Sequence, residues 1–258
     1  MLKKLFKLDF LWINKFAPYF LGGALILALA SRLTLNLTSI AGIIFHNTFQ
    51  SLAISATVGL VCNVFARTIV RFKNSLIKDE SYLLRTLPVT PATHWHSRAL
   101  SFLASTIFCV LSILTVLALL FLDHDLWQTI ATLAQENTPA LIFLVLTIFA
   151  ETTTLGFSIF TSTLLGRRAQ TQRNLKTALY ALLFYWGAQL LLLGSAFLLG
   201  QLFPSLKAIF AATDDMSFLD VTKTFQNFFI FSGTFYTLCS VALYFLGSHT
   251  LQKGIDVE

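Results

Sequence analysis

The chain has 258 residues, of which 56% are hydrophobic and 12% are charged, and its formal net charge is +6. Soluble domains carry about 25% charged residues, so this composition excludes an ordinary soluble globular protein. The charges fall in short intervals between long apolar runs, and a membrane-spanning helix needs about 20 apolar residues. We therefore expect an all-α integral membrane protein with a single membrane domain. The positive charge is expected to reflect orientation in the membrane and contact with lipid headgroups; we expect no nucleic-acid partner.

Residues 1–15, MLKKLFKLDFLWINK, alternate apolar and basic side chains at helical spacing. This pattern predicts an amphipathic helix that lies in the cytoplasmic membrane interface, with Trp12 at the level of the lipid headgroups. The alternative is a simple basic flank that sets the topology. No cleavable signal peptide is expected, because four lysines precede an apolar run of full span length.

Six apolar runs follow, each long enough to cross a bilayer. Their expected bounds are 16–37, 48–70, 99–122, 139–165, 177–203 and 224–246, within one transmembrane domain at 16–246 and before a cytoplasmic tail at 247–258. The expected outer loops are 39–47, 123–137 and 204–223, and the last has the alternating pattern of an interfacial re-entrant helix. The three cysteines (Cys62, Cys109 and Cys239) lie inside the spans without metal-ligand spacing.

The basic residues are distributed asymmetrically between the two sides of these spans. Of the 18 Lys and Arg residues, only Arg32, Lys207 and Lys223 lie on the side of the outer loops; the others lie in the N-terminal segment, the second loop, the fourth loop and the tail. The positive-inside rule then places both termini in the cytoplasm. We expect a multi-pass protein of the cell membrane, that is, the plasma or inner membrane.

The most informative loop is the cytoplasmic segment 78–98, KDESYLLRTLPVTPATHWHSR. Thr90 and Pro91 predict a helix start, since Thr is a good N-cap and Pro suits the first helical turn. Pro88 disfavours helix at Leu87, so a turn is expected between them and Thr90. Apolar side chains precede this turn in a segment expected to lie outside the lipid: Tyr82, Leu83, Leu84 and Leu87. This pattern favours either a surface that docks a protein partner or packing on the protein's own helices.

The fourth run carries one acidic residue, Glu151, deep in the expected membrane span. Twelve residues past Pro139 it lies about 18 Å into the span, near the middle of a hydrocarbon core of about 30 Å. Charged groups at this depth are costly and usually face the interior of a bundle. Thr154, Ser158 and either Thr161 or Ser162 continue the same face at helical spacing. The stripe predicts either the lining of a translocation path with a proton-sensitive group, or a protonated Glu151 that holds two helices together.

Two further sets of residues are expected to serve packing. Gln189 with Gly187, and Gly233 with Thr237, are typical of helix contacts in membranes.

His94 and His96 are two residues apart and do not share a helical face, so no metal site is expected there. The chain contains no G-x-x-x-x-G-K-[ST] motif, so we expect it not to bind ATP in the P-loop manner.

Residues 82–90, YLLRTLPVT, resemble the signature Y-L-x-x-[ST]-L-P-V-[ST] of permease subunits of type-2 ATP-binding-cassette (ABC) exporters. In that family the motif precedes a helix leading into the third span, which here corresponds to 91–98, with Arg98 where Lys is more common. The opening (LFKLDF and ALASRL) and the tail (LQKGIDVE) are similar to the family's L-L-K-Y-E-F … A-x-x-N-R-L and L-x-K-K-L-N-L-E. They depart from it at Asp9, Ser31 and Gly254, and Glu151 is unusual.

The resemblance implies a half-transporter that pairs with a second permease, identical or related, into a twelve-span dimer. Separate ABC-type ATPase subunits would bind ATP and Mg, so this chain would hold no cofactor and would not itself be an enzyme. Its coupling segment would contact the ATPase through Tyr82, Leu83, Arg85, Leu87, Pro88, Val89, Thr90 and Pro91. The apolar spans favour a peptide, lipid or drug-like cargo, with Glu151, Thr154, Ser158 and Ser162 as candidates for its path. The alternatives are an ion-coupled secondary transporter that uses Glu151, an intramembrane enzyme, or a non-catalytic membrane scaffold.

Overall fold

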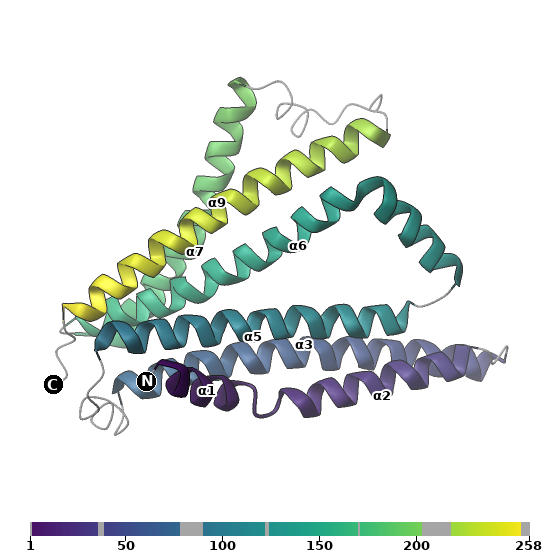
Figure 1. Ribbon diagram of the computed structural model, residues 1–258, viewed down its shortest axis with the longest axis horizontal. Coiled ribbons are helices and arrows are strands. Elements are labelled where there is room, and N and C mark those ends of the chain that lie inside the picture. Colours follow the sequence, from purple (N-terminus) through teal and green to yellow (C-terminus); the bar gives the residue numbers. More distant parts are fainter. Residues whose placement is uncertain are drawn as a thin grey trace. The chain divides into compact units, whose positions relative to one another are not determined.

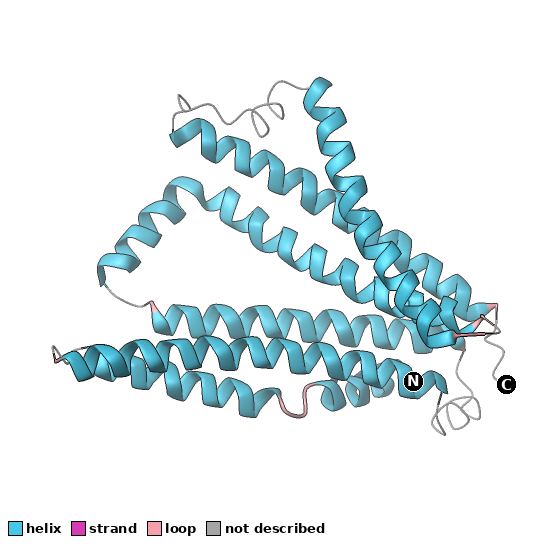
Figure 2. Ribbon diagram, turned by 180° about the vertical axis from the view of Figure 1, so that it is seen from behind, coloured by secondary structure: helices cyan, strands magenta, loops and turns pink. Residues whose placement is uncertain are grey.

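The computed structural model describes residues 2–35, 39–77, 90–121, 124–169, 171–202 and 218–253, and within these ranges it is entirely helical apart from short turns (Figures 1 and 2). The helices are α1 (Leu2–Ile13), α2 (Ala17–Leu35), α3 (Ile40–Ile77), α5 (Pro91–Leu120), α6 (His124–Arg167), α7 (Arg173–Leu202) and α9 (Phe218–Gln252). The predicted all-α class is confirmed for the described part of the chain.

Six of these helices are long and apolar enough to cross a membrane, namely all except α1. This agrees with the six predicted spans and indicates a multi-pass membrane protein. The helix at the N-terminus is present as α1, while its position at a membrane interface stays a prediction.

Residues 40–47 and 124–137, expected to be parts of outer loops, are helical, because α3 already begins at Ile40 and α6 at His124. Their location outside the membrane stays a prediction. Hydropathy marks where a helix is apolar, whereas helical hydrogen bonding continues into polar sequence wherever it remains favourable. Pro139, the expected start of the fourth span, lies inside α6. Its ring removes one backbone hydrogen bond, and proline is the usual cause of a helix kink. Residues 204–217 of the third expected loop lie outside the described residues, and α9 begins at Phe218.

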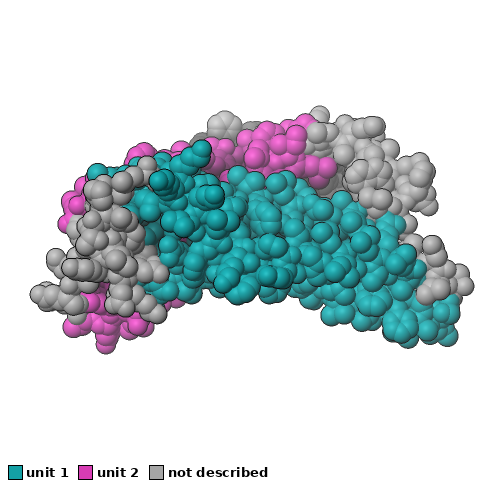
Figure 3. Space-filling view, turned by 60° about the horizontal axis from the view of Figure 1, so that its bottom comes forward, with its two compact units in different colours: residues 1–130 teal, residues 131–258 magenta. Residues whose placement is uncertain are grey.

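The chain divides into two compact units, Met1–Ile130 and Ala131–Glu258 (Figure 3). The first contains α1, α2, α3 and α5, and the second contains most of α6 together with α7 and α9.

In the first unit, α2 packs along α3, and both contact α5. The contact surfaces include several small residues beside larger aliphatic ones: Ala17, Ala24, Ala28 and Ala53 are all fully buried. Small side chains allow helix backbones to approach closely in a membrane, where dispersion contacts replace the hydrophobic effect as the main attraction.

Helix α1 lies against a ridge of serines on α5. Ser97, Ser101 and Ser105 are spaced four residues apart, so they form one row along that helix, and all are buried. Ser101 donates to the Phe6 carbonyl (3.3 Å), and the Asn14 amide donates to Ser105 Oγ (2.8 Å). The first helix of the chain is therefore fixed to the bundle by polar contacts as well as by its apolar side chains.

Three arginines bind carbonyl groups near the C-terminal ends of neighbouring helices. Arg32 donates to Leu119 of α5 (3.0 Å), Arg67 to Trp12 of α1 (2.6 Å), and Arg168 to Thr250 of α9 (2.6 Å). The last carbonyls of a helix lack intrahelical donors and carry partial negative charge, so a guanidinium there is favourable. Arg32 of α2 thus caps the C-terminal end of α5.

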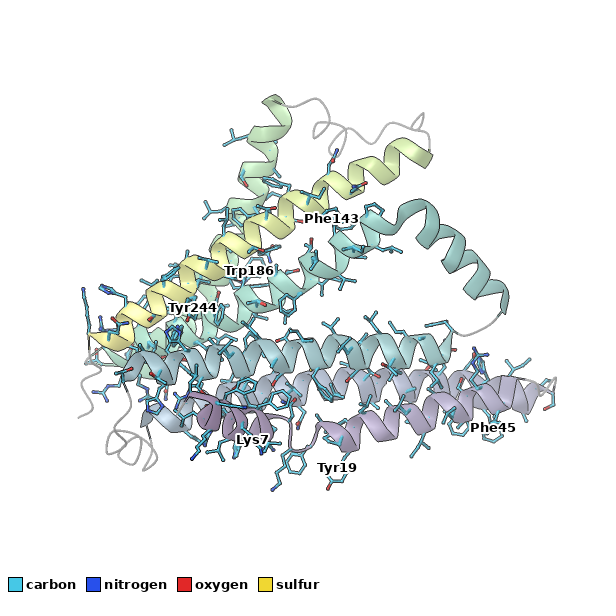
Figure 4. All side chains as sticks on the ribbon, viewed as in Figure 1. Lys7, Tyr19, Phe45, Phe143, Trp186 and Tyr244 are labelled. Atoms are coloured by element: carbon cyan, nitrogen blue, oxygen red, sulfur yellow. The ribbon has the colours of Figure 1, made fainter. Side chains whose placement is uncertain are left out.

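Large apolar side chains cover the outer surfaces of both units. Tyr19 is 76% exposed and points away from α2 in Figure 4, and Leu190 and Leu191 of α7 are each 66% exposed. Such surfaces suit contact with lipid or with another membrane protein.

Candidate functional site

Helices α6 and α9 of the second unit are joined by a ladder of hydrogen bonds with a repeat of seven residues. Thr147, Thr154 and Thr161 donate to the carbonyls of Phe229, Tyr236 and Leu243, at 2.8, 2.9 and 3.0 Å. Arg168 continues the series to Thr250, and every pair is separated by 82 positions. A constant separation means that the two helices run parallel in one register, and a repeat of seven is typical of left-handed packing.

The ladder requires close approach of the two backbones. A Cβ atom placed on Gly233 would lie 2.8 Å from Thr147 Oγ1, which leaves no room for any other residue at this position without movement. Thr154 also hydrogen-bonds Ser240 Oγ (2.8 Å). The prediction that Gly233 serves helix packing is confirmed, whereas Gly187 has nothing within 4 Å of its Cβ position, so no close packing requires a glycine there.

Glu151 lies beside this ladder and takes part in a hydrogen-bond chain across three helices. Gln189 Nε2 of α7 donates to Glu151 Oε1 of α6 (3.1 Å), and the Tyr236 hydroxyl of α9 donates to Gln189 Oε1 (2.8 Å). Tyr236 is 4% exposed and packs with Ala150 and Leu192. The same residue thus contributes its ring hydroxyl to this chain and its backbone carbonyl to the ladder.

The residues of the predicted polar stripe on α6 form two groups, which differ in their hydrogen-bond partners. Thr154 and Thr161 face α9 and form the ladder. Ser158 and Ser162 are fully buried, and they donate to carbonyls of their own helix, those of Thr154 (2.7 Å) and Ile159 (2.9 Å). Glu151 is only partly buried. Of the path candidates, Glu151 therefore has the side chain with the greatest capacity to bind a further group.

A groove of about 390 Å³ opens along the α6–α9 contact and is mostly apolar. Ala150, Thr153, Gly233 and Ser240 are among its lining residues. Glu151 is not one of them, so the groove and the carboxylate are separate features of the second unit.

Most of the predicted coupling segment, from Tyr82 to Val89, lies outside the described residues. Its end is described: Thr90 is the N-cap of α5 and accepts from the Thr93 amide, and Pro91 stands in the first turn. The predicted helix start is confirmed, and 91–98 continues without interruption into the third membrane helix.

A cluster that the sequence reasoning missed lies close to this helix start. Asp9 of α1 is 5% exposed; it forms an ion pair with Arg71 of α3 (2.9 Å) and accepts from Ser97 of α5 (3.3 Å). The Phe72 and Trp95 rings meet edge to face at 6.1 Å beside it. The available signal was Asp9 itself, the single acidic residue in a basic helix.

His94 and His96 both lie in the first two turns of α5, where residues two apart project in different directions. Within the described ranges, no group of three His, Cys, Asp or Glu side chains has an arrangement that would hold a metal ion.

Comparison with protein-family models, with curated proteins and with solved structures finds no match for this chain.

Proposed function

We propose that this protein is the membrane permease subunit of an ABC exporter. It moves a peptide, lipid or drug-like cargo across the plasma or inner membrane with ATP hydrolysed by a separate ATPase subunit. The proposal rests on the resemblance of residues 82–90 to the permease signature together with six candidate spanning helices. The observation that carries it is the position of that motif directly before α5, whose first turn is set by Thr90 and Pro91.

The contacts around the start of α5 suit the transmission of a push from an ATPase. Through Ser97 and Trp95, α5 is joined to Asp9 of α1 and to Phe72 of α3. A displacement of the coupling segment would therefore move three helices together, which is how a packed interface converts a local contact into repacking of the spans.

The test is purification of the tagged full chain from its native membranes in mild detergent. We expect a stoichiometric ATPase subunit and a second permease in the particle. Leu87→Asp is expected to remove the ATPase and its stimulated ATP hydrolysis, because burying an unpaired carboxylate in an apolar groove costs on the order of several kcal/mol. Leu87→Met, which keeps an apolar side chain of similar volume, is the matched control and should retain both.

Retention of the ATPase by Leu87→Asp would refute the assigned contact. A stable particle that lacks any ATPase would refute the proposed function itself.

The second candidate is an ion-coupled secondary transporter, and the partly buried Glu151 in its hydrogen-bond chain is the observation that favours it. Such a protein would catalyse flux in vesicles without ATP, driven by an ion gradient, and Glu151→Gln would abolish that flux. A membrane scaffold would show neither ATP-dependent nor gradient-dependent transport.

A further inference from the structure

Glu151 is deep within the membrane portion of α6. The candidate span runs from Leu141 to Arg167, so the carboxylate is about 15 Å from one end and about 24 Å from the other at 1.5 Å per residue. Burying an ionisable group at this depth in a bilayer costs free energy, and such groups usually mark functional sites. The hydrogen bonds, charges and aromatic side chains around Glu151 therefore indicate what it can bind.

The hydrogen bonds around Glu151 point toward the carboxylate. Tyr236 donates its hydroxyl proton to Gln189, and Gln189 donates its amide proton to Glu151 Oε1. In this arrangement Gln189 Nε2 points at Oε1, which accepts its proton. No described residue donates to the second oxygen, Oε2, and the side chain is partly exposed. One oxygen is held in place while the other remains available to a ligand.

The described part of the second unit places no positive side chain in contact with this carboxylate. Its membrane helices contain no Lys or Arg over 141–166, 177–198 and 226–248. No ion pair to Glu151 occurs among the described residues. A buried or half-buried carboxylate without a positive partner is unfavourable, so the binding of a cation beside Glu151 would be favourable.

An aromatic side chain lies near this carboxylate. Tyr236, bonded to Gln189, belongs to a buried cluster with Ala150 and Leu192, and Phe231 and Phe235 pack against that cluster. Tyr185 lies one helical turn before Gln189 and therefore on the same side of α7. Aromatic faces attract organic cations through the ring quadrupole.

The chemistry favours an organic cation over a metal ion. Calcium needs 6–8 oxygen ligands and magnesium needs a near-ideal octahedron, whereas this site offers one free carboxylate oxygen and no acidic or histidine cluster within the described residues. We propose that Glu151, oriented by Gln189 and with Tyr236 and Tyr185 on the neighbouring helices α9 and α7, binds the ammonium or other organic cation of an amphipathic molecule. As a cargo site this rests on the proposed transport function; as a binding site it does not.

The test uses radiolabelled tetraphenylphosphonium, a lipophilic organic cation, with the purified full chain in lipid nanodiscs and empty nanodiscs as the blank. Tetraphenylborate has the same shape and the opposite charge. We expect saturable binding of the cation and none of the anion. Glu151→Gln is expected to weaken binding by about tenfold or more, equivalent to about 1.4 kcal/mol, because it removes the charge and keeps the hydrogen-bond acceptor.

Further variants separate the site from general effects on the fold. Tyr236→Phe keeps the ring but loses the bond that orients Gln189, and a loss of about threefold is expected, since a neutral hydrogen bond is worth about 0.5–1.5 kcal/mol. Thr163→Ala, on α6, removes a hydroxyl that donates to the Ile159 carbonyl of the same helix (2.7 Å), and this variant should bind as the wild type does. Glu151→Asp keeps the negative charge and should retain part of the affinity. That result would show that the loss of binding in Glu151→Gln comes from the lost charge and not from misfolding.

Equal cation binding by the wild type and a monodisperse Glu151→Gln variant would overturn the proposal. So would saturable binding of sodium that depends on Glu151 while tetraphenylphosphonium does not bind. The assay contains neither ATP nor ATPase, so its failure leaves ATPase co-purification unaffected, and loss of the ATPase partner leaves cation binding measurable.

Discussion

The ion pair between Asp9 and Arg71 is expected to hold α1 to the bundle, and its removal is the sharpest test of the packing described above. Asp9 Oδ1 lies 2.9 Å from Arg71 Nε, and the two side chains are 8% and 19% exposed. Breaking a buried pair by removing one partner costs about 3–5 kcal/mol. Arg71→Met should therefore reduce the free energy of unfolding by about 3 kcal/mol, at the low end of that range because the arginine is partly exposed.

The two single substitutions should not cost the same. After Arg71→Met, the partner that remains to Asp9 among the described residues is the hydroxyl of Ser97 at 3.3 Å. After Asp9→Asn, the arginine keeps its position over the Trp12 ring, 5.6 Å from the ring centre, and more contact with solvent. Asp9→Asn should cost less, about 1–2 kcal/mol, in the range for loss of a hydrogen bond to a charged group.

Unfolding of the purified full chain in mixed detergent and SDS micelles, followed by circular dichroism, measures these differences. The double variant should be more stable than the sum of the single effects predicts by at least about 1 kcal/mol. Lys73→Met, an exposed neighbour on α3, is the matched control and should change little. Additivity of the two substitutions within about 0.5 kcal/mol, or an equal effect of Lys73→Met, would refute the assigned role.

Two further predictions concern glycines and use the same unfolding measurement. Gly233→Ala should destabilise the second unit by about 1–3 kcal/mol, the usual cost of overpacking, because the new Cβ would lie 2.8 Å from Thr147 Oγ1. Gly187→Ala is the control: its Cβ would have nothing within 4 Å, so it should be neutral or stabilising. Equal effects of the two substitutions would disprove the close α6–α9 contact. Gly166→Ala should lower the free energy of unfolding at least as much as Gly233→Ala does. Its Cβ would lie 2.8 Å from the backbone N and Cα of Thr177, and backbone atoms cannot change rotamer as a side chain can. Gly194→Ala, whose Cβ has nothing within 4 Å, is the control.

Much of the architecture followed from composition and local pattern. Long apolar runs predicted six membrane helices because each backbone polar group in lipid must be satisfied within its own helix. Thr90 and Pro91 predicted the start of α5, since an N-cap and a proline in the first turn act through neighbours in sequence. Where the sequence misjudged the ends of α3 and α6, the reason is that hydropathy reports the environment of a helix and not its length.

The contacts between helices depended on the tertiary structure. Thr147, Thr154 and Thr161 show a repeat of seven in the sequence, but only the structure matches each of them to a carbonyl 82 positions further along the chain. Glu151 was recognisable as a costly charge, whereas its partner Gln189 lies 38 positions further along, on another helix. Asp9 appeared as a minor variation at the N-terminus and proved to be buried against Arg71. Solvation by lipid and backbone hydrogen bonding within a helix depend on neighbours in the sequence, so they can be predicted from it. The pairing of one helix face with another depends on residues far apart in the chain, so only the three-dimensional arrangement decides it.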